Sequence, residues 1–452
     1  MTKDMTQGSP MRLLLNFTIP LVLGNLFQQV YNIADTIIVG RTLGPNALAA
    51  VGASSSLTFL ILGFVTGTCS GFAIPVAQRF GAKDESAMRR FVVNSAYLAA
   101  ILAVVITIAT SLLCMTILRG MGTPDEIIQD AYAYLIVIFI GIPFTFLYNL
   151  LAGIIRALGD SRTPFVFLLF STVLNIILDL LFILQFHMGV MGAGLATILA
   201  QAVSGILCLI FMIRKFTLLR VQKGEAQVEA RKMRILLYIG VPMGLQFSIT
   251  AIGMIMLQMA INSLGTIYIT GYAVAMKIKQ LVMCPYDAIG NAMATYGGQN
   301  LGAGKYKRIY QGYRSSMIIG FIYSIAAFFI LYLQGSNIAS LFMKDANVEI
   351  IAAAQQYLTS IGIFYFVLSA LVITRCTVQG LGYSMFAFFA GVLEMIARTA
   401  MSVFAIPKFG YAAACFTDPT AWFVAVLFLI PLFFYVMRKV QGKRKVPHKG
   451  KL

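Results

Sequence analysis

Residues 13–39 read LLLNFTIPLVLGNLFQQVYNIADTIIV, a run longer than the roughly 20 apolar residues that a helix needs to cross a bilayer. Similar runs recur along the whole chain of 452 residues, of which 59% are hydrophobic and 11% are charged. Soluble globular proteins carry about 25% charged residues. This composition therefore excludes a soluble globular protein and predicts an all-α polytopic membrane protein.

Twelve transmembrane spans are predicted when apolar runs are read between charge clusters and Gly or Pro residues. Several exceed the minimum length, so we expect them to tilt or to project from the bilayer. We place the spans at 13–39, 47–75, 91–118, 127–153, 164–186, 190–213, 235–262, 267–296, 311–333, 350–374, 383–406 and 410–437.

The basic residues predict the orientation of these spans. Most of the 34 Lys and Arg lie in the N-terminal segment, in the C-terminal segment, or in loops on the same side of the membrane as these two segments. Basic residues are enriched in the cytoplasmic loops of membrane proteins. We therefore expect both termini in the cytoplasm. The net charge of +18 then reflects membrane topology, so the expected partners include membrane lipids and no nucleic acid.

The sequence lacks the motifs that several other functional classes require. The six Cys are scattered in apolar runs without metal-ligand spacing, which predicts packing residues and no metal framework. No hydrolase, zinc-protease or phosphate-loop motif occurs, so we expect neither an enzyme nor direct use of ATP. No cofactor is expected other than a coupling ion.

The chain repeats itself at half its length. Three motifs recur at offsets of 222, 221 and 223 residues: Met11–Leu15 as Met233–Leu237, Gln78–Ala82 as Gln299–Ala303, and Arg156–Ser161 as Gln379–Ser384. Each half holds six spans, an even number, so the halves are parallel repeats related by a pseudo-two-fold axis along the membrane normal. We predict an N-lobe (1–213), a cytoplasmic linker (214–234), a C-lobe (235–437) and a basic tail (438–452). This organisation is typical of an alternating-access transporter.

Polar residues inside the N-lobe spans are candidates for function, because a charge at bilayer depth costs at least about 2.5–3.5 kcal/mol. Helical spacing places them on one face of each of three spans. These residues are Asn25, Gln28, Asn32 and Asp35 in the first span, Asn175 and Asp179 in the fifth, and Thr197 and Gln201 in the sixth.

Two interpretations of these faces are open. They form an oxygen-rich pocket for Na⁺ or for a shared proton, or they form a hydrogen-bonded seam between helices. For Asp35 and Asp179 the functional interpretation is favoured, because a buried pair of like charges is costly as structural glue. For Asn25, Gln28 and Gln201 both interpretations stay open.

The C-lobe does not repeat this pattern. Asp35 corresponds to Leu257, and Asn175 and Asp179 correspond to Arg398 and Ser402. The C-lobe carries charges of its own, which either compensate one another or form a secondary polar site. They are Lys277, Lys279, Asp287, Glu394, Arg398 and Asp418. Glu394 and Arg398 stand four residues apart and are expected to pair.

The sequence resembles the bacterial multidrug and toxic compound extrusion (MATE) transporters over essentially the whole chain. The order and spacing of several short motifs carry this resemblance. They are Ile19-Pro20, Asp35–Gly40 leading to Ala47–Gly52, Arg156–Asp160, Asn175 through Asp179, and Gly297–Ala303.

The resemblance implies an antiporter in the bacterial inner membrane that exports organic cations and hydrophobic drugs in exchange for H⁺ or Na⁺. It implies a cation site at Asp35, Asn175, Asp179 and Thr197, and we expect a hinge at Pro20 and a monomer. One family branch also uses a C-lobe acidic cluster that begins in the seventh span, but residues 246–250 contain no acid. That second site is therefore not expected. The alternative function is a lipid-linked saccharide flippase of the same superfamily, which Lys277 and Lys279 would suit if they faced a cleft.

Overall fold

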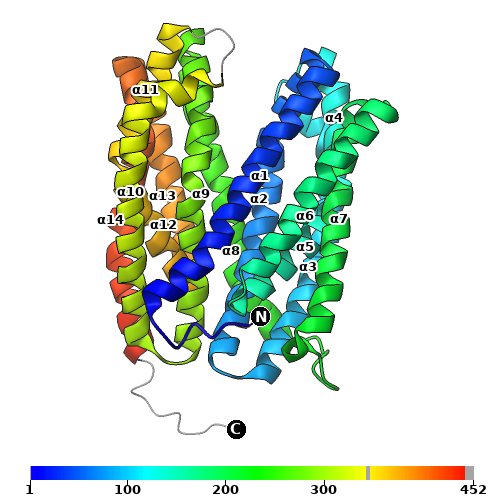
Figure 1. Cartoon of the computed structure of the whole chain (residues 1–452), viewed down its shortest axis with the longest axis vertical. Helices are drawn as coiled ribbons and strands as arrows, with labels where there is room; N and C mark the ends of the chain where they lie inside the picture. Colours follow the sequence, from blue (N-terminus) through cyan, green and yellow to red (C-terminus); the bar gives the residue numbers. More distant parts are fainter. Residues whose placement is uncertain (1, 343–346, 443–452) are drawn as a thin grey trace. The chain divides into compact units, whose positions relative to one another are not determined.

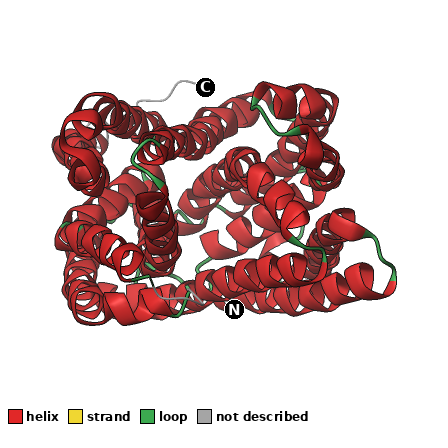
Figure 2. Cartoon of the chain, turned by 90° about the horizontal axis from the view of Figure 1, so that it is seen from above, coloured by secondary structure: helices red, strands yellow, loops and turns green. Residues whose placement is uncertain are grey.

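The computed structural model describes residues 2–342 and 347–442, and within these residues every regular element is helical (Figures 1 and 2). The first half contains α1 (Pro10–Thr42), α2 (Pro45–Gly81), α3 (Glu85–Gly120), α4 (Asp125–Ile140), α5 (Ile142–Ala157), α6 (Arg162–Leu180) and α7 (Gly189–Lys215). The second half contains α8 (Ala230–Asn262), α9 (Thr266–Gly302), α10 (Tyr306–Ser340), α11 (Val348–Ile363), α12 (Tyr365–Gly380), α13 (Ser384–Ala400) and α14 (Ile406–Gly442). Two π-helices, η1 (Leu181–Gln185) and η3 (Met401–Ala405), continue α6 and α13, and a short 3₁₀-helix η2 (Thr217–Leu219) follows α7.

The predicted all-α fold with twelve spans is confirmed. In the described part of the chain, eight helical stretches are long and apolar enough to cross a membrane, or ten if each of two bent helix pairs is one span. One of these stretches, Ser384–Gly442, holds two spans, because Gly410 breaks the helix with a φ of 61°. The remaining span is α9, which is 37 residues long and carries Lys277, Lys279 and Asp287.

Two spans that the sequence predicts as continuous, 127–153 and 350–374, are bent. The pair α4 and α5 meets at 48°, and the pair α11 and α12 meets at 56°. Pro143 explains the first bend, because proline removes a backbone donor and clashes with the preceding turn. The two bends lie at corresponding positions of the two repeats, so they belong to the duplicated architecture.

The chain forms two compact units whose boundaries cut through helices. Unit 1 comprises Met1–Asp4 and Ile19–Ala251, and unit 2 comprises Met5–Thr18 and Ile252–Leu452. The start of α1 therefore packs with unit 2, and the start of α8 packs with unit 1. Helix α1 passes from one unit to the other next to Pro20, the predicted hinge. The lobe bounds of 1–213 and 235–437 stay a prediction, and residues 443–452 of the predicted tail lie outside the described residues.

Glycines allow the first part of α8 to lie close against α2 within unit 1. A Cβ added to Gly71 would lie 2.5 Å from the Gly240 Cα, and a Cβ added to Gly244 would lie 2.4 Å from Thr68 Oγ1. Close approach of backbones through small residues is a common basis of helix packing in membranes, where there is little hydrophobic driving force between helices.

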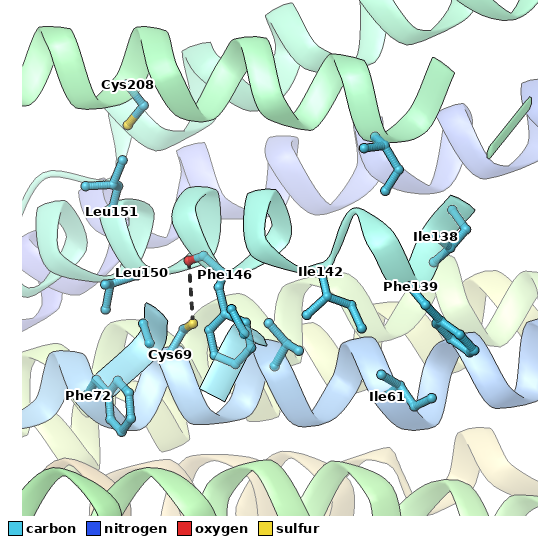
Figure 3. Close-up of a cluster of buried hydrophobic side chains, with 14 of the residues drawn as sticks. Ile61, Cys69, Phe72, Ile138, Phe139, Ile142, Phe146, Leu150, Leu151 and Cys208 are labelled. Carbon is cyan, nitrogen blue, oxygen red and sulfur yellow. Dashed lines mark hydrogen bonds between the residues drawn. The ribbon is translucent and has the colours of Figure 1, made fainter. Parts of the chain in front are cut away.

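The core of unit 1 is formed by α2, α3, α7 and the bent pair α4–α5, and Figure 3 shows the part of it between α2 and α5. Cys69 and Phe72 of α2 are fully buried against Phe146 and Leu150 of α5, and the Cys69 thiol donates to the Phe146 carbonyl at 3.8 Å. The described cysteines are free thiols, five of the six are buried, and none is disulfide-bonded.

The core of unit 2 is unusually aromatic. Tyr286, Tyr357, Tyr365 and Trp422 are each at most 2% exposed and belong to one cluster. The ring of Tyr365 lies 6.2 Å from that of Trp422, and the Tyr286 hydroxyl is hydrogen-bonded to Ser324 at 2.9 Å. The rings of Tyr357 and Trp422 lie within 6.0 Å of the Lys279 ammonium, one of the charged residues of this unit that are described below.

The linker between α7 and α8 is held to α3 by charged contacts within unit 1. The Arg89 guanidinium donates two hydrogen bonds to the Glu225 carboxylate, at 2.6 and 3.0 Å, and both side chains are buried. Arg90 forms a longer ion pair with Glu229, at 3.3 Å. The backbone N–H of Glu229 also donates to the Asn94 side chain at 2.8 Å. The linker is therefore an ordered part of unit 1.

This anchoring predicts that acid loosens the linker. The hydrogen bonds from Arg89 lower the pKa of Glu225 to about 2, from an ordinary value of 4.5. A carboxylate with a lowered pKa stabilises the fold above its ordinary pKa, and this contribution is lost as the pH falls through the lowered one. We therefore expect hydrogen–deuterium exchange of residues 216–229, corrected for its intrinsic pH dependence, to rise as the pH falls from 4.5 to 2. Glu225→Gln should exchange fast already at neutral pH, and equal protection of both chains there would contradict the anchoring role.

Candidate functional site

Two helices of unit 1 bring the predicted carboxylates together. Asp35 lies near the end of α1, and Asn175 and Asp179 lie one turn apart on α6. The side chains of Asn175 and Asp179 are buried, with exposed fractions of 3% and 0%. Asp179 stands two residues before the π-helix η1, an irregularity that occurs frequently at functional sites.

The carboxyl groups of Asp35 and Asp179 lie close enough to each other to share a hydrogen bond. The Oδ1 atoms of both residues are buried and have no donor group of the protein within reach. A hydrogen bond between two carboxyl groups requires a proton on one of them, because two ionised carboxylates repel. The pair therefore suits a shared proton or a small cation between its oxygens.

Asn175 and Thr197 complete the oxygen-rich site. With the Asn175 amide oriented to satisfy both of its polar atoms, its nitrogen donates to Asp179 Oδ2 at 2.9 Å and its oxygen accepts from the Thr197 N–H at 3.0 Å. The Thr197 hydroxyl donates to the Ala193 carbonyl at 3.0 Å, which holds this side chain in place on α7. The structure thus brings together the four residues that the resemblance implies as a cation site.

Two tyrosines also belong to this site, and the sequence did not assign them to it. The Tyr31 hydroxyl is hydrogen-bonded to Thr197 Oγ1 at 3.0 Å. Tyr134 of α4 is 9% exposed and lies within electrostatic range of both Asp35 and Asp179. A signal for Tyr31 was present, because it lies one helical turn before Asp35. Tyr134 comes from a separate helix, and no spacing in the sequence points to it.

The other polar residues predicted in the N-lobe lie outside this contact network. The Thr145 hydroxyl on α5 donates to Gln201 at 2.7 Å, which is the seam interpretation for that residue. Asn25 is half-buried and has a polar interaction of its own. Gln28 and Asn32 are exposed on α1, outside the unit's core.

Among the described residues of unit 2, the C-lobe charges form a buried ion-pair network. Asp418 on α14 pairs with the Lys279 ammonium and accepts from Arg398 Nε at 2.8 Å. Tyr357 donates to the same carboxylate at 2.7 Å. The side chains of Lys279, Arg398 and Asp418 are at most 5% exposed. The Asp418 carboxylate is therefore paired with two basic side chains of the same unit.

A second acid extends the network. Glu394 accepts from Arg375 at 2.9 Å and contacts Arg398 at 3.5 Å, which confirms the expected pairing one turn apart. Asp287 and Lys277 are exposed and are not part of the ion pairs. Charge compensation is thus the arrangement that the structure shows for Lys279, Glu394, Arg398 and Asp418.

The charges differ in kind between the two sites. Asp35 and Asp179 form no ion pair with a basic side chain of the described residues, so the unit 1 site has two acids and no internal counter-ion. In unit 2, each buried acid contacts two basic side chains. In the described residues, no group of three or more His, Cys, Asp or Glu side chains is placed to hold a metal ion.

Comparison with known protein families shows the duplication directly. The family model MatE matches residues 20–181 and matches again over residues 242–404. The chain is 31% identical over 366 residues to "Probable multidrug resistance protein YpnP" of Bacillus subtilis, and the match covers 80% of each chain. It is 22% identical to "Multidrug export protein MepA" of Staphylococcus aureus, over 84% of each chain.

Solved structures share the same fold. A structure described as the outward-facing conformation of a multidrug resistance MATE family transporter of the MOP superfamily matches with a TM-score of 0.91 and 22% identity. That match covers 98% of this chain and 99% of the other. A MOP superfamily transporter from Pyrococcus furiosus, whose binding pocket is described as having reversed polarity, matches with a TM-score of 0.89 at 23% identity.

Proposed function

Since this chain belongs to the MATE family of transporters, we propose that it exports drugs from a bacterium in exchange for H⁺ or Na⁺. The expected cargo is cationic or amphipathic and hydrophobic, in keeping with the multidrug resistance that its relatives are named for. The proposed location is the inner membrane, with both termini in the cytoplasm and a monomer as the working unit.

One observation carries this proposal: the contact between Asp35 and Asp179 in buried surroundings without a basic partner. Binding of a proton or of a small cation to two acids placed in this way is favourable, because the bound cation relieves the repulsion between the two carboxylates. Such a site is a means of making conformation depend on a cation gradient.

The proposed cycle follows from linkage between two ligands. A cation that enters from the outside binds Asp35 and Asp179 and changes the packing of α1, for which Pro20 provides the hinge. Drug is then released, and the next drug is bound from the cytoplasm only after the cation has left. Each ligand weakens the binding of the other by the same factor, as any antagonism between two sites requires.

A lipid-linked saccharide flippase is less well supported. That function would require basic groups free to bind a pyrophosphate, and Lys279 is instead paired with Asp418 inside unit 2. Only Lys277 of the two lysines is exposed. The flippase therefore stands as the outcome favoured if drug transport fails the following test.

The test is efflux of a fluorescent cationic dye from energised cells that carry the wild type, Asp179→Asn or the exposed-site control Glu126→Gln. NaCl pulses at fixed pH and pH steps at fixed salt are applied separately, so that the effective pulse identifies the ion. We expect dye loss in the wild type and in Glu126→Gln, and a strongly reduced initial rate of dye loss in Asp179→Asn. Dye loss that persists unchanged in Asp179→Asn would overturn the proposal.

A further inference from the structure

The ion-pair network of unit 2 stands where the second repeat would carry its own copy of the cation site. Helices α2 and α9 are both 37 residues long and begin 221 residues apart, so Lys279 takes the place of Thr58. Helices α7 and α14 each contain a left-handed glycine, Gly189 and Gly410, with φ of 59° and 61°. Thr197 and Asp418 follow these glycines at the same distance, and so they are equivalent positions.

The remaining positions follow the same rule. Arg398 takes the place of Asn175, and both precede a π-helix on the equivalent helix. Gly253 takes the place of Tyr31, and a Cβ on it would lie 3.3 Å from Arg398 Cδ. The small residue thus leaves room for the long arginine side chain. At the positions equivalent to Asn175 and Thr58 the second repeat thus carries two permanent cations, whereas the acids Asp35 and Asp179 correspond to Leu257 and Ser402.

We propose that Lys279 and Arg398 are built-in counter-ions that occupy, in the second repeat, the place of the exchangeable cation of the first. This inference rests on the proposed function of the Asp35–Asp179 site. The first site presents two acids without a base, whereas the ion-paired residues of the second comprise three bases, Lys279, Arg375 and Arg398, against Glu394 and Asp418. A carboxylate that is already paired with permanent cations attracts a further cation only weakly. Asp35 and Asp179 consequently hold the exchangeable cation, and the ion-paired residues of the second repeat stay charged and paired throughout the cycle.

Trp422 provides a local probe of this site. It is the single Trp of the chain, it is 2% exposed, and the Lys279 ammonium lies 5.7 Å from its ring centroid. Replacement of the Lys279 charge by a bound mobile cation would change the electric field at the Trp422 indole and so its emission. The unit 1 site has no Trp, so cation binding there has no such local probe.

The experiment replaces the two cations of the second repeat by the residues at the equivalent positions of the first. Purified wild type, Lys279→Thr/Arg398→Asn, and the same double variant with Asp418→Asn are titrated with NaCl against choline chloride at constant ionic strength, and Trp422 emission is recorded. We expect no Na⁺-specific change in the wild type, a saturable shift in the double variant, and loss of that shift when Asp418→Asn is added. The triple variant leaves Asp418 uncharged, and it therefore also reports whether the two cations can be removed without loss of folding.

Two outcomes overturn the inference. One is a saturable Na⁺ response in the wild type that Lys279→Gln/Asp418→Asn removes, because the second repeat would then hold an exchangeable cation. The other is a folded double variant without any Na⁺ response. If the double variant does not fold, the wild-type comparison still decides. No transport is measured, so a failure of the proposed efflux function, seen in the dye assay, is distinguishable from a failure here.

Discussion

Asp418→Leu is expected to destabilise the folded chain strongly. The substitution leaves the buried Lys279 and Arg398 without the carboxylate that both contact, and Tyr357 without its acceptor. Removal of one partner from a buried ion pair costs about 3–5 kcal/mol, because a charge is left uncompensated in a medium of low polarity. Thermal unfolding of detergent-purified protein, followed by size-exclusion chromatography, measures the loss.

The matched control removes a charge of each sign. Lys279→Met/Asp418→Leu replaces an ion pair by apolar side chains of similar size, which is often close to neutral for stability. Arg398 keeps its contact with Glu394 in this variant. We expect the double variant to recover most of the folded yield that Asp418→Leu loses. A single variant as stable as the wild type would show that the network does not stabilise unit 2.

Asp35→Asn is expected to reduce cation-driven efflux by roughly 5–150-fold, the usual range for coupling between two sites. The amide keeps the size of the side chain but can neither carry the negative charge nor share a proton with Asp179. The measurement is the initial rate of dye efflux, driven by whichever pulse, NaCl or pH, drives efflux in the wild type. Asp130→Asn, an exposed carboxylate on α4, is the matched control and should transport normally.

Asp35 and Asp179 should behave as a single cation site in this measurement. If one cation is held between both carboxyl groups, Asp35→Asn and Asp179→Asn each remove it, and their combination should cost no more than either alone. Independent losses that multiply in the double variant would indicate two separate sites. Folded yields equal to the wild type for both single variants would show that the loss is functional.

The sequence predicted the unit 1 site because its residues obey helical periodicity. Asn175 and Asp179 lie one turn apart, so their common face follows from spacing alone. Spacing also placed Asp35 and Thr197 on the polar faces of two other spans, and the resemblance joined the four residues into one site. The structure places these four side chains together. Their role in cation binding is still a prediction, which the dye assay tests.

The unit 2 network was beyond this kind of reasoning. Lys279 and Asp418 are 139 residues apart, and their contact depends on how α9 and α14 both pack against α11 and α12. Spacing within one helix predicted the pair Glu394 and Arg398, but it cannot indicate a partner on another helix. The bends and π-helices were also missed, since a long apolar run has the same appearance whether the helix is regular or interrupted.

The start of α1 belongs to unit 2, and this determines when unit 2 can form during synthesis of the chain. The backbone of Met5 is hydrogen-bonded to Gln299, a residue made 294 positions later. At about 5–20 residues per second, the first segment waits roughly 15–60 s for its partner. Unit 2 therefore cannot close until the ribosome has passed α9, and Met5 reaches its final contact only after well over half of the chain has been made.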